Sequence, residues 1–419
     1  MPELLEIKCK KQTRVVLFLV ILFVMERPRF ITYITSGTQW RTVFFVMEIL
    51  VYVYILLVWI NNRRVSGIFI MALLLYGTII ISTLYNGGSV GTAIQNHIGY
   101  IFMVMLIDNE IDDIDSLWQA CILYLMLMTI IDSVVAVSFP GGLYPNNFTY
   151  NGQQYSNQRT LFFSAQNGFG IYLIYFLFFK GEYDLRKRSR VGLTFYILFI
   201  VGFVIMAVNL RSLTTMVGSL AMFIIIVLSE VINKMQPRLF SIYSFMGIVL
   251  VMFISFVVLS IIGNLSGLFI TDVLGGSLTF SGRKIIWEHA IDKIALRPIL
   301  GYGYMSTTGV RNLLELSSAP HAHDYFLQLG LIGGCLAIVL YLITLVKVAD
   351  SIKKKQYDYT EIVITAFMFA FLILSVFEYS TSKLYWAVFA YAFYRGKKQA
   401  TVKEKPSMTN ELLGWSFII

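Results

Sequence analysis

Two histidines and a carboxylate stand close together in the run Pro320-His321-Ala322-His323-Asp324. An imidazole has an ordinary pKa of about 6.5, so near neutral pH it can take a proton from a hydroxyl group. His323 is therefore a candidate general base for transfer to an alcohol. We expect His321 and Asp324 to bind substrate beside it.

Arginines are the second group of chemical interest, because they outnumber lysines in the segments predicted to share a membrane face with His323. A guanidinium presents a planar fork of donors that binds two phosphate oxygens at once. We expect Arg211 and Arg283 to stabilise a phosphate leaving group, and we expect four others to bind substrate: Arg27, Arg41, Arg159 and Arg297. For a single arginine, pairing with a lipid headgroup or a carboxylate is the alternative.

The spacing of His321, His323 and Asp324 also raises the question of a metal. Three side chains within four residues, without another outer histidine or cysteine, form a poor tetrahedral set. The three cysteines fall in predicted spans or in the N-terminal tail: Cys9, Cys121 and Cys335. We therefore predict no metal, no other cofactor and no disulfide in the outer loops.

The elements that must position these residues are membrane helices. The composition is 57% hydrophobic and 14% charged, so most residues are solvated by lipid. Apolar runs of spanning length predict an all-α polytopic membrane protein with about twelve transmembrane helices. The predicted spans are 14–34, 42–60, 65–85, 91–107, 117–138, 161–179, 191–208, 213–228, 240–262, 325–347, 361–377 and 384–394.

The orientation follows from the basic residues of the short loops, which are retained in the cytoplasm. Lysine and arginine gather on one side, in the ranges 8–14, 63–64, 180–190, 234–238, 347–355 and 395–405. Both termini are therefore predicted to be cytoplasmic, and the long loop 263–324, between the ninth and tenth spans, to be extracytoplasmic. The formal charge of +9 sits mainly in loops facing anionic lipid, so we predict no nucleic-acid partner.

The domain organisation is simple. Residues 1–395 form one transmembrane domain, and residues 396–419 form a cytoplasmic tail. Within the long loop, the apolar spacing of Arg283–Leu296 predicts a helix lying along the membrane interface. The hairpin Asn209–Ser212 joins two spans almost without a loop, and it should hold Arg211 at the outer mouth of the bundle. Glu378 and Lys383 are expected to pair with each other, and Glu48 to neutralise Arg27 or Arg41.

Four stretches occur in an order that resembles a known family. They are Ser281-Gly282-Arg283-Lys284-Ile285-Ile286-Trp287, Arg297-Pro298-Ile299-Leu300-Gly301-Tyr302-Gly303, His323-Asp324-Tyr325-Phe326-Leu327-Gln328 and Gly330-Leu331-Ile332-Gly333. Together they resemble the signature region of the O-antigen polymerase and ligase superfamily, of the Wzy/WaaL type. Arg159 with Gln166-Asn167-Gly168, and the hairpin 209–215, match it more weakly. Asp324 stands where the family usually has Asn.

The resemblance implies a bacterial glycosyltransferase of the cytoplasmic membrane whose active site lies on the extracytoplasmic face. Such an enzyme uses a glycan carried on a polyprenyl diphosphate, typically undecaprenyl. We expect a polysaccharide polymerase for O-antigen, capsule or exopolysaccharide, whose partners are a polyprenyl-diphosphate-linked donor, a similarly linked acceptor and membrane lipids. Arginines standing in for a divalent metal, and a direct displacement, imply a metal-independent inverting transferase.

The sequence leaves other functions open. A ligase, which moves the glycan to a different acceptor such as lipid A core, shares the donor and the loop. A flippase for the same lipid-linked oligosaccharide has a similar number of spans, although transporters show repeated halves and midplane sites. A receptor or scaffold would leave the arginine bias unexplained. A chain-length regulator and a flippase are the protein partners that the resemblance leaves open.

Overall fold

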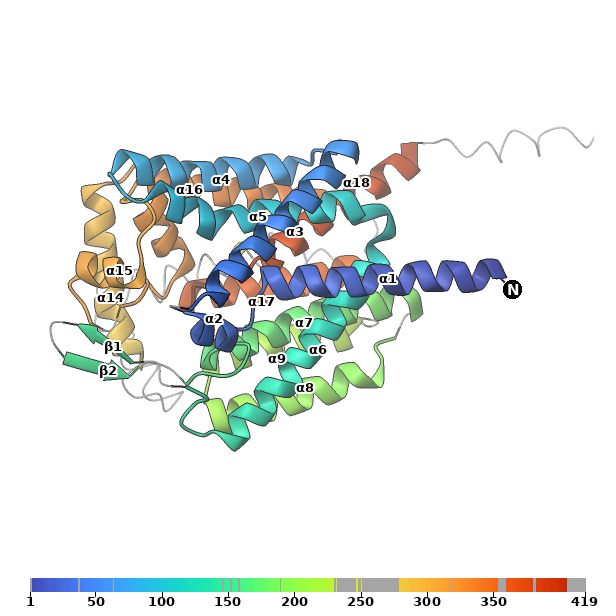
Figure 1. The fold of residues 1–419 in the computed structure, drawn as a ribbon, viewed down its shortest axis with the longest axis horizontal. Helices are drawn as coiled ribbons and strands as arrows, with labels where there is room; N and C mark the ends of the chain where they lie inside the picture. The colour runs from blue at the N-terminus through green and yellow to red at the C-terminus, as the bar shows by residue number, and fades with distance from the viewer. Residues whose placement is uncertain are drawn as a thin grey trace, which may run out of the picture.

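The computed structural model describes residues 2–229 and 279–404, apart from gaps at 37, 63, 145–146, 151–152, 157–158, 189, 318, 353–358 and 380–381, together with residues 231, 246–247 and 250. Long helices run beside one another and form the body of the molecule (Figure 1). The predicted span 240–262 and residues 263–278 of the long loop lie almost wholly outside the described residues, as does most of the tail.

The first part of the chain is entirely helical. Its elements are α1 (Pro2–Met25), α2 (Arg29–Thr35), α3 (Trp40–Asn62), α4 (Gly67–Tyr85), α5 (Val90–Glu110), the 3₁₀ turn η1 (Ile111–Asp113) and α6 (Ile114–Ser138). α4 and α5 begin at serines whose side chains accept a backbone N–H of the first turn, from Phe69 and Thr92 respectively. These serines satisfy backbone donors that the helix itself cannot pair.

The second part adds one small hairpin to the helices. Its elements are β1 (Asn147–Tyr150), β2 (Gln153–Ser156), α7 (Gln166–Arg188), α8 (Leu193–Ile205), the π-helical turn η2 (Met206–Leu210), α9 (Leu213–Val227), α14 (Thr279–Leu296), α15 (Thr307–Leu314), α16 (Tyr325–Ile352), α17 (Tyr359–Phe377) and α18 (Leu384–Glu404). β1 and β2 pair antiparallel, with Asn147 opposite Ser156. The chain is thus almost all helical, as predicted.

A helix occupies each predicted span within the described residues, with one difference. The predicted span 14–34 is divided, because α1 ends at Met25 and α2 begins only at Arg29. Pro28 explains the break, since a proline pushes the preceding residue out of the helical region. Among the described residues, six apolar helical segments are long enough to cross a membrane: Trp40–Asn62, Gly67–Tyr85, Val90–Ser138, Leu193–Leu210, Tyr325–Ile352 and Tyr359–Phe377. The count of twelve crossings stays a prediction.

Burial separates central helices from peripheral ones. The apolar window of α17 is 94% buried, whereas that of α3 is only 6% buried. Apolar side chains that remain exposed along a helix match a lipid environment, because lipid tails solvate them without cost. α17 therefore forms the centre of the bundle, against α7 and α9, and α3 forms part of its lipid-facing rim.

One end of the bundle carries most of the short elements. α2, the β1–β2 hairpin, α14 and α15 gather there, at the left of Figure 1, far from the N-terminus. α14 contains the predicted interfacial helix Arg283–Leu296. The helices that begin or end at this same end include α5, α7, α16, α17 and α18.

The turn after α14 lies directly on two other helices. Gly303 has φ +79°, and a Cβ there would stand 2.5 Å from the Cα of Thr83 on α4. Gly301 has φ +63°, and its Cβ would stand 2.5 Å from the carbonyl oxygen of Leu331 on α16. A larger residue at either position would force the backbones apart. The close contact fixes α14 and α15 above the ends of the long helices.

Candidate functional site

A cavity of about 920 Å³ lies at the end of the bundle that carries α2 and α15. Its walls come from the α1–α2 turn, α5, the start of α7, α15, the loop before α16 and the α17–α18 turn. Its polar lining residues include Arg27, Arg29, Asn96, His97, Asn167, Tyr304, Arg311, His321, His323, Gln328, Glu378, Ser382 and Lys383. The volume is at the upper end of the range for ligand pockets.

The two loop histidines lie together on the cavity wall. The backbone N–H of His323 donates to Nδ1 of His321 over 3.1 Å, and the ring centroids are 4.1 Å apart. Because Nδ1 of His321 accepts this bond, the neutral ring carries its proton on Nε2. His323 itself has φ +54°, a left-handed conformation that is uncommon outside glycine and that often marks functional sites.

Both imidazoles are held in their neutral form. Burial, followed by the positive charges of Arg283 and Arg311, lowers the pKa of His321 to about 4. Burial, followed by His321 and Arg283, lowers the pKa of His323 well below its usual range. Among the described residues, Nδ1 of His323 is buried without a hydrogen-bond partner. At neutral pH this ring can therefore accept a proton.

Glu378 lies beside the histidines and pairs with Arg283. Nη2 of Arg283 stands 3.1 Å from Oε2 of Glu378. Burial raises the pKa of this glutamate, while Arg283 and then a hydrogen bond from Asn167 act in the opposite direction. The expected pair between Glu378 and Lys383 is wrong, because Nζ of Lys383 donates to the carbonyl oxygen of Met25 instead.

A metal was predicted to be absent because His321, His323 and Asp324 form a poor tetrahedral set without another outer histidine or cysteine. The fold places a different carboxylate beside the two histidines, since ligand atoms of His321, His323 and Glu378 lie within 4.8 Å of one another. Two imidazoles and a carboxylate are a common zinc set. However, Arg283 stands 3.1 Å from Glu378 and already neutralises it, and its charge would repel a divalent ion next to these ligands.

Asp324, predicted to bind substrate, lies behind the cavity wall. It is fully buried, and its Oδ1 accepts the backbone N–H of Leu327 over 2.7 Å. It thereby caps the start of α16. Burial raises the pKa of Asp324 well above its usual range, although hydrogen bonds from the backbone of Leu327 and Phe326 lower it. Its effect on the site is to fix where His323 stands.

The α8–α9 hairpin meets the site through a different residue from the one predicted. Arg211 has φ +52°, but its side chain is exposed and the described lining of the cavity does not include it. Instead, the hydroxyl of Ser212 donates to Oδ1 of Asn167 over 3.0 Å, and Asn167 lines the cavity. Arg159 holds the hairpin from outside, donating to the carbonyl oxygen of Asn209 over 2.5 Å.

The other predicted arginines divide into one cavity residue and two peripheral ones. Arg27 lines the cavity and is 3.6 Å from Oε2 of Glu48, so the prediction that Glu48 neutralises it is confirmed. Arg41 is exposed and does not belong to the described lining. Arg297 is also exposed; it donates to Oδ1 of Asn86 and covers the ring of Tyr302 at 4.8 Å, which anchors the turn after α14.

Several lining residues were not predicted from the sequence to belong to the site. Arg29 and Arg311 belonged to the outer arginines, but nothing in their spacing distinguished them from Arg41 or Arg297. Lys383 and Asn167 reach the cavity only because the starts of α18 and α7 lie beside the histidine loop. Three tyrosines, Tyr100, Tyr304 and Tyr379, add aromatic surface, on which sugar rings can stack.

Residues 197–342 match a family model described as O-antigen ligase. This range runs from within α8 to within α16, and it contains Arg211, Arg283, Arg297, His321 and His323. No curated protein sequence matches the chain.

Proposed function

Because residues 197–342 match a family model described as O-antigen ligase, we propose that the chain belongs to the O-antigen polymerase and ligase superfamily and is a polysaccharide polymerase. It transfers a glycan from a polyprenyl diphosphate carrier to a hydroxyl group of a lipid-linked repeat unit. The reaction takes place at the extracytoplasmic face of a bacterial cytoplasmic membrane. The observation that supports this most is a neutral histidine, His323, on the wall of a cavity that is lined by cations and by tyrosines.

The proposed reaction is a direct displacement. The acceptor oxygen forms a bond to the anomeric carbon, the bond between that carbon and the diphosphate oxygen breaks, and the acceptor proton passes to His323. Attack opposite the leaving group inverts the anomeric carbon. Arg283 and Arg311 are the cations whose charges act on the histidines, so they are placed to stabilise the departing diphosphate.

The donor would also strengthen the base. In the empty site, Arg283 holds down the pKa of His323 after burial and His321. A bound diphosphate neutralises this positive charge, and the pKa of the imidazole then rises. His323 would thus become an effective proton acceptor only when the donor is in place.

Two neighbours position the catalytic groups. Glu378 holds the guanidinium of Arg283 at 3.1 Å, and His321 holds the backbone of His323. Asn167 connects this group to the α8–α9 hairpin through Ser212. We propose that these contacts fix the distance between base and leaving group, which a displacement needs within a few tenths of an ångström.

The test is polymerisation by the purified protein in liposomes that contain only lipid-linked repeat units. We expect products that lengthen in steps of one repeat, and loss of these products in His323→Ala. His289→Ala is the matched control, because His289 lies on α14 and is not part of the described cavity lining. Transport of the lipid-linked unit across the bilayer, without any bond formed, would instead indicate a flippase.

A ligase is the second candidate, because the matching family model is described as O-antigen ligase. The same liposomes separate the two when they are supplied with a second acceptor, such as a lipid A core. A ligase forms product only with that acceptor. A polymerase lengthens the repeat units without it.

The face of the membrane needs its own experiment. In a Cys335→Ser background, a cysteine at Lys284 on α14 should react with an impermeant maleimide in intact cells. A cysteine at Arg188, at the other end of α7, should react only after the membrane is opened. Reversed labelling would place the site in the cytosol and exclude the proposed reaction.

A further inference from the structure

The cations that act on the cavity come from two separate parts of the fold. Arg283 and Arg311, here called the histidine-side pair, lie on α14 and α15 and lower the pKa of His321. Arg27, Arg29 and Lys383, here called the turn cluster, lie on the α1–α2 turn and the α17–α18 turn and line the cavity directly. The charges that lower the pKa of the histidines are those of the histidine-side pair, not those of the turn cluster.

The turn cluster has a fixed geometry, because hydrogen bonds join its two turns to each other. The backbone N–H of Lys383 donates to Oε1 of Glu26 over 2.5 Å, and Nζ of Lys383 donates to the carbonyl oxygen of Met25. Glu26 is only 7% exposed. The hydroxyl of Tyr124 donates to the carbonyl oxygen of Glu26 over 2.5 Å. These bonds hold the cations of both turns at one place.

A glycine makes room for the lysine. A Cβ at Gly99 on α5 would stand 2.3 Å from Cε of Lys383 and 2.8 Å from the hydroxyl of Tyr52. Any other residue at position 99 would displace the Lys383 side chain. The glycine at position 99 thus leaves the space in which the Lys383 side chain lies at the cavity wall.

The turn cluster presents more cations than carboxylates to the cavity. Arg27, Arg29 and Lys383 belong to the described lining, whereas Glu26 and Glu48 do not. Glu48 neutralises Arg27 over a separation of 3.6 Å, which is longer than a hydrogen bond. Among the described residues, no carboxylate forms a salt bridge with the side chain of Arg29 or Lys383. Donors of the turn cluster that face the cavity can therefore bind phosphate oxygens.

We propose that the turn cluster is a second diphosphate subsite, which binds the polyprenyl diphosphate of the acceptor while the histidine-side pair binds that of the donor. This inference rests on the proposed function and deepens it. The acceptor's reacting hydroxyl lies at the far end of its glycan from its diphosphate, so the two diphosphates need separate sites. Two lipid-linked glycans need two cationic sites for their diphosphates and aromatic surface for their sugars. The cavity offers both, because the two groups of cations lie at it and Tyr100, Tyr304 and Tyr379 line its walls.

The first experiment counts binding sites with farnesyl diphosphate, a short polyprenyl diphosphate, by calorimetry on the purified chain in detergent. We expect two molecules per chain for the parent, and one for either Arg27→Gln/Arg29→Gln or Arg283→Gln/Arg311→Gln. Arg188→Gln/Arg190→Gln removes the same charge from exposed arginines at the other end of the bundle, and it should keep two sites. Arg27→Lys/Arg29→Lys should restore the second site in part.

Three outcomes would overturn the inference. In the first, the parent binds only one farnesyl diphosphate. In the second, the turn-cluster variant loses both binding sites. In the third, dioleoyl phosphatidate displaces farnesyl diphosphate from the second site with the same efficiency as unlabelled farnesyl diphosphate. The last result would mean that the cluster holds an ordinary phospholipid headgroup. Size-exclusion profiles and melting temperatures of each variant show whether a loss of binding is a loss of folding.

The second experiment separates donor from acceptor. It uses two substrate analogues. The donor analogue has a blocked terminal hydroxyl, so it cannot accept a glycan. The acceptor analogue has a non-cleavable phosphonate linkage, so it cannot donate its glycan. Arg27→Gln/Arg29→Gln should raise the KM for the acceptor about tenfold or more, because charge-assisted hydrogen bonds are lost, and change the KM for the donor much less. An equal change in both constants would contradict the second subsite. A parent that forms no bond with these substrates would instead contradict the proposed function.

Discussion

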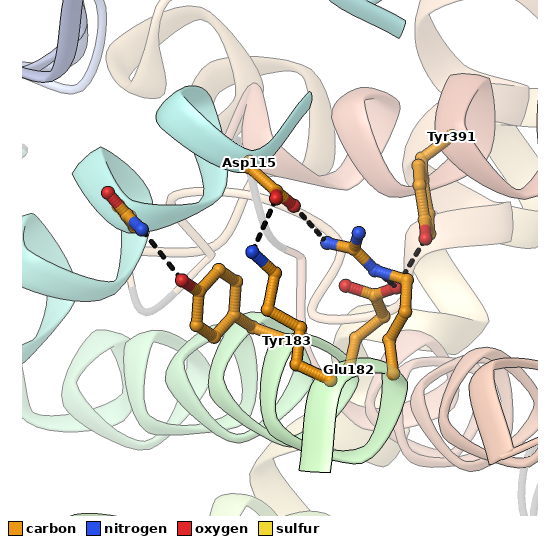
Figure 2. A network of polar contacts seen from close by, with 7 residues as sticks. Asp115, Glu182, Tyr183 and Tyr391 are labelled. Atoms are coloured by element: carbon orange, nitrogen blue, oxygen red, sulfur yellow. Dashed lines mark hydrogen bonds and ion pairs between the residues drawn. The ribbon is translucent and has the colours of Figure 1, made fainter. Parts of the chain in front are cut away.

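The two ends of the helical bundle both contain many charges, but they use them differently. At the end near the N-terminus, cations are paired with carboxylates (Figure 2). Arg186 stands 2.7 Å from Oδ1 of Asp115 and 2.8 Å from Oε1 of Glu182. Lys187 contacts the other oxygen of Asp115 at 2.5 Å, and the hydroxyl of Tyr391 contacts Glu182. At the junction of α5 and η1, Glu110 and Asp113 pair with Arg14, and Asp112 pairs with Arg64.

At the cavity end, cations face an open space. Arg27 is 3.6 Å from Oε2 of Glu48 and lies over the ring of Phe44, and Lys383 and Arg29 line the cavity beside it. His323 has a buried nitrogen without a partner among the described residues. A folded chain ordinarily satisfies its buried polar groups, and those that it leaves open tend to be functional. The difference teaches that the paired end holds the bundle together, whereas the cavity end is built to receive an anion.

The largest effect should follow the removal of His323. His323→Ala should lower the rate of glycan transfer by about 100- to 10,000-fold, the usual contribution of a general base, while the melting temperature stays near that of the parent. The measurement is the initial rate of polymer formation from lipid-linked repeats. A rate within threefold of the parent would show that the unpartnered nitrogen has no catalytic part.

The paired end should show the opposite response. Arg186→Ala leaves Glu182, which is fully buried, without its cation, and we expect a loss of about 3 to 5 kcal/mol in stability. Thermal unfolding of the purified protein measures it, and activity per folded molecule should be unchanged. Arg188→Ala, an exposed neighbour on the same helix, is the control. A stable but inactive Arg186→Ala protein would break the comparison.

Arg283 should act on both rate and pH dependence. Arg283→Gln should reduce kcat by about 100-fold, because a preorganised charge at the leaving group is lost. Its charge lowers the pKa of both histidines. Without it those pKa values rise, and the acid limb of the pH–rate profile should move to higher pH. Lys284→Gln, at the neighbouring position, is the control. An acid limb that does not shift in Arg283→Gln would show that the charge of Arg283 does not act on the pKa of His323.

The smallest effect concerns Asp324. Its pKa is raised in the folded state, so the folded protein is favoured at low pH and loses this stability as the pH rises from about 4 through the folded value. Asp324→Asn keeps the acceptor for Leu327 without the buried charge. We expect it to be more stable than the parent at pH 8, by on the order of 1 kcal/mol, and equally stable below pH 4. Melting temperatures at both pH values test this, with Asp324→Ala as the destabilised control.

Much of the fold could be predicted because its causes are local. Apolar runs marked the helices, and the spacing from Arg283 to Leu296 marked a helix in the long loop. The break that divides the first predicted span was not predicted, although Pro28 is a local cause for it. Each signal depends on neighbours within a turn or two, so it can be read without knowing the tertiary structure.

The site could be predicted only in part. His321, His323 and Arg27 line the cavity, and Arg283 lies next to it through its pair with the lining residue Glu378, whereas Arg41, Arg211 and Arg297 are outside the described cavity lining. All seven are polar residues of the same predicted face, and nothing local distinguishes the two groups. The partner of Glu378 was also misjudged, because nearness along the chain suggested Lys383 while the fold brings in Arg283.

Local sequence patterns were sufficient to predict a helical, membrane-type chain and a histidine loop before α16, and region 197–342 matches the O-antigen ligase family model. Only the tertiary structure decided which cations face one cavity, which carboxylates neutralise them, and that the α1–α2 turn meets the α17–α18 turn. The physical reason is that periodicity and turn chemistry act over a few residues. Charge pairing, burial and the shape of a cavity depend instead on segments hundreds of residues apart, which only packing of the whole bundle brings together.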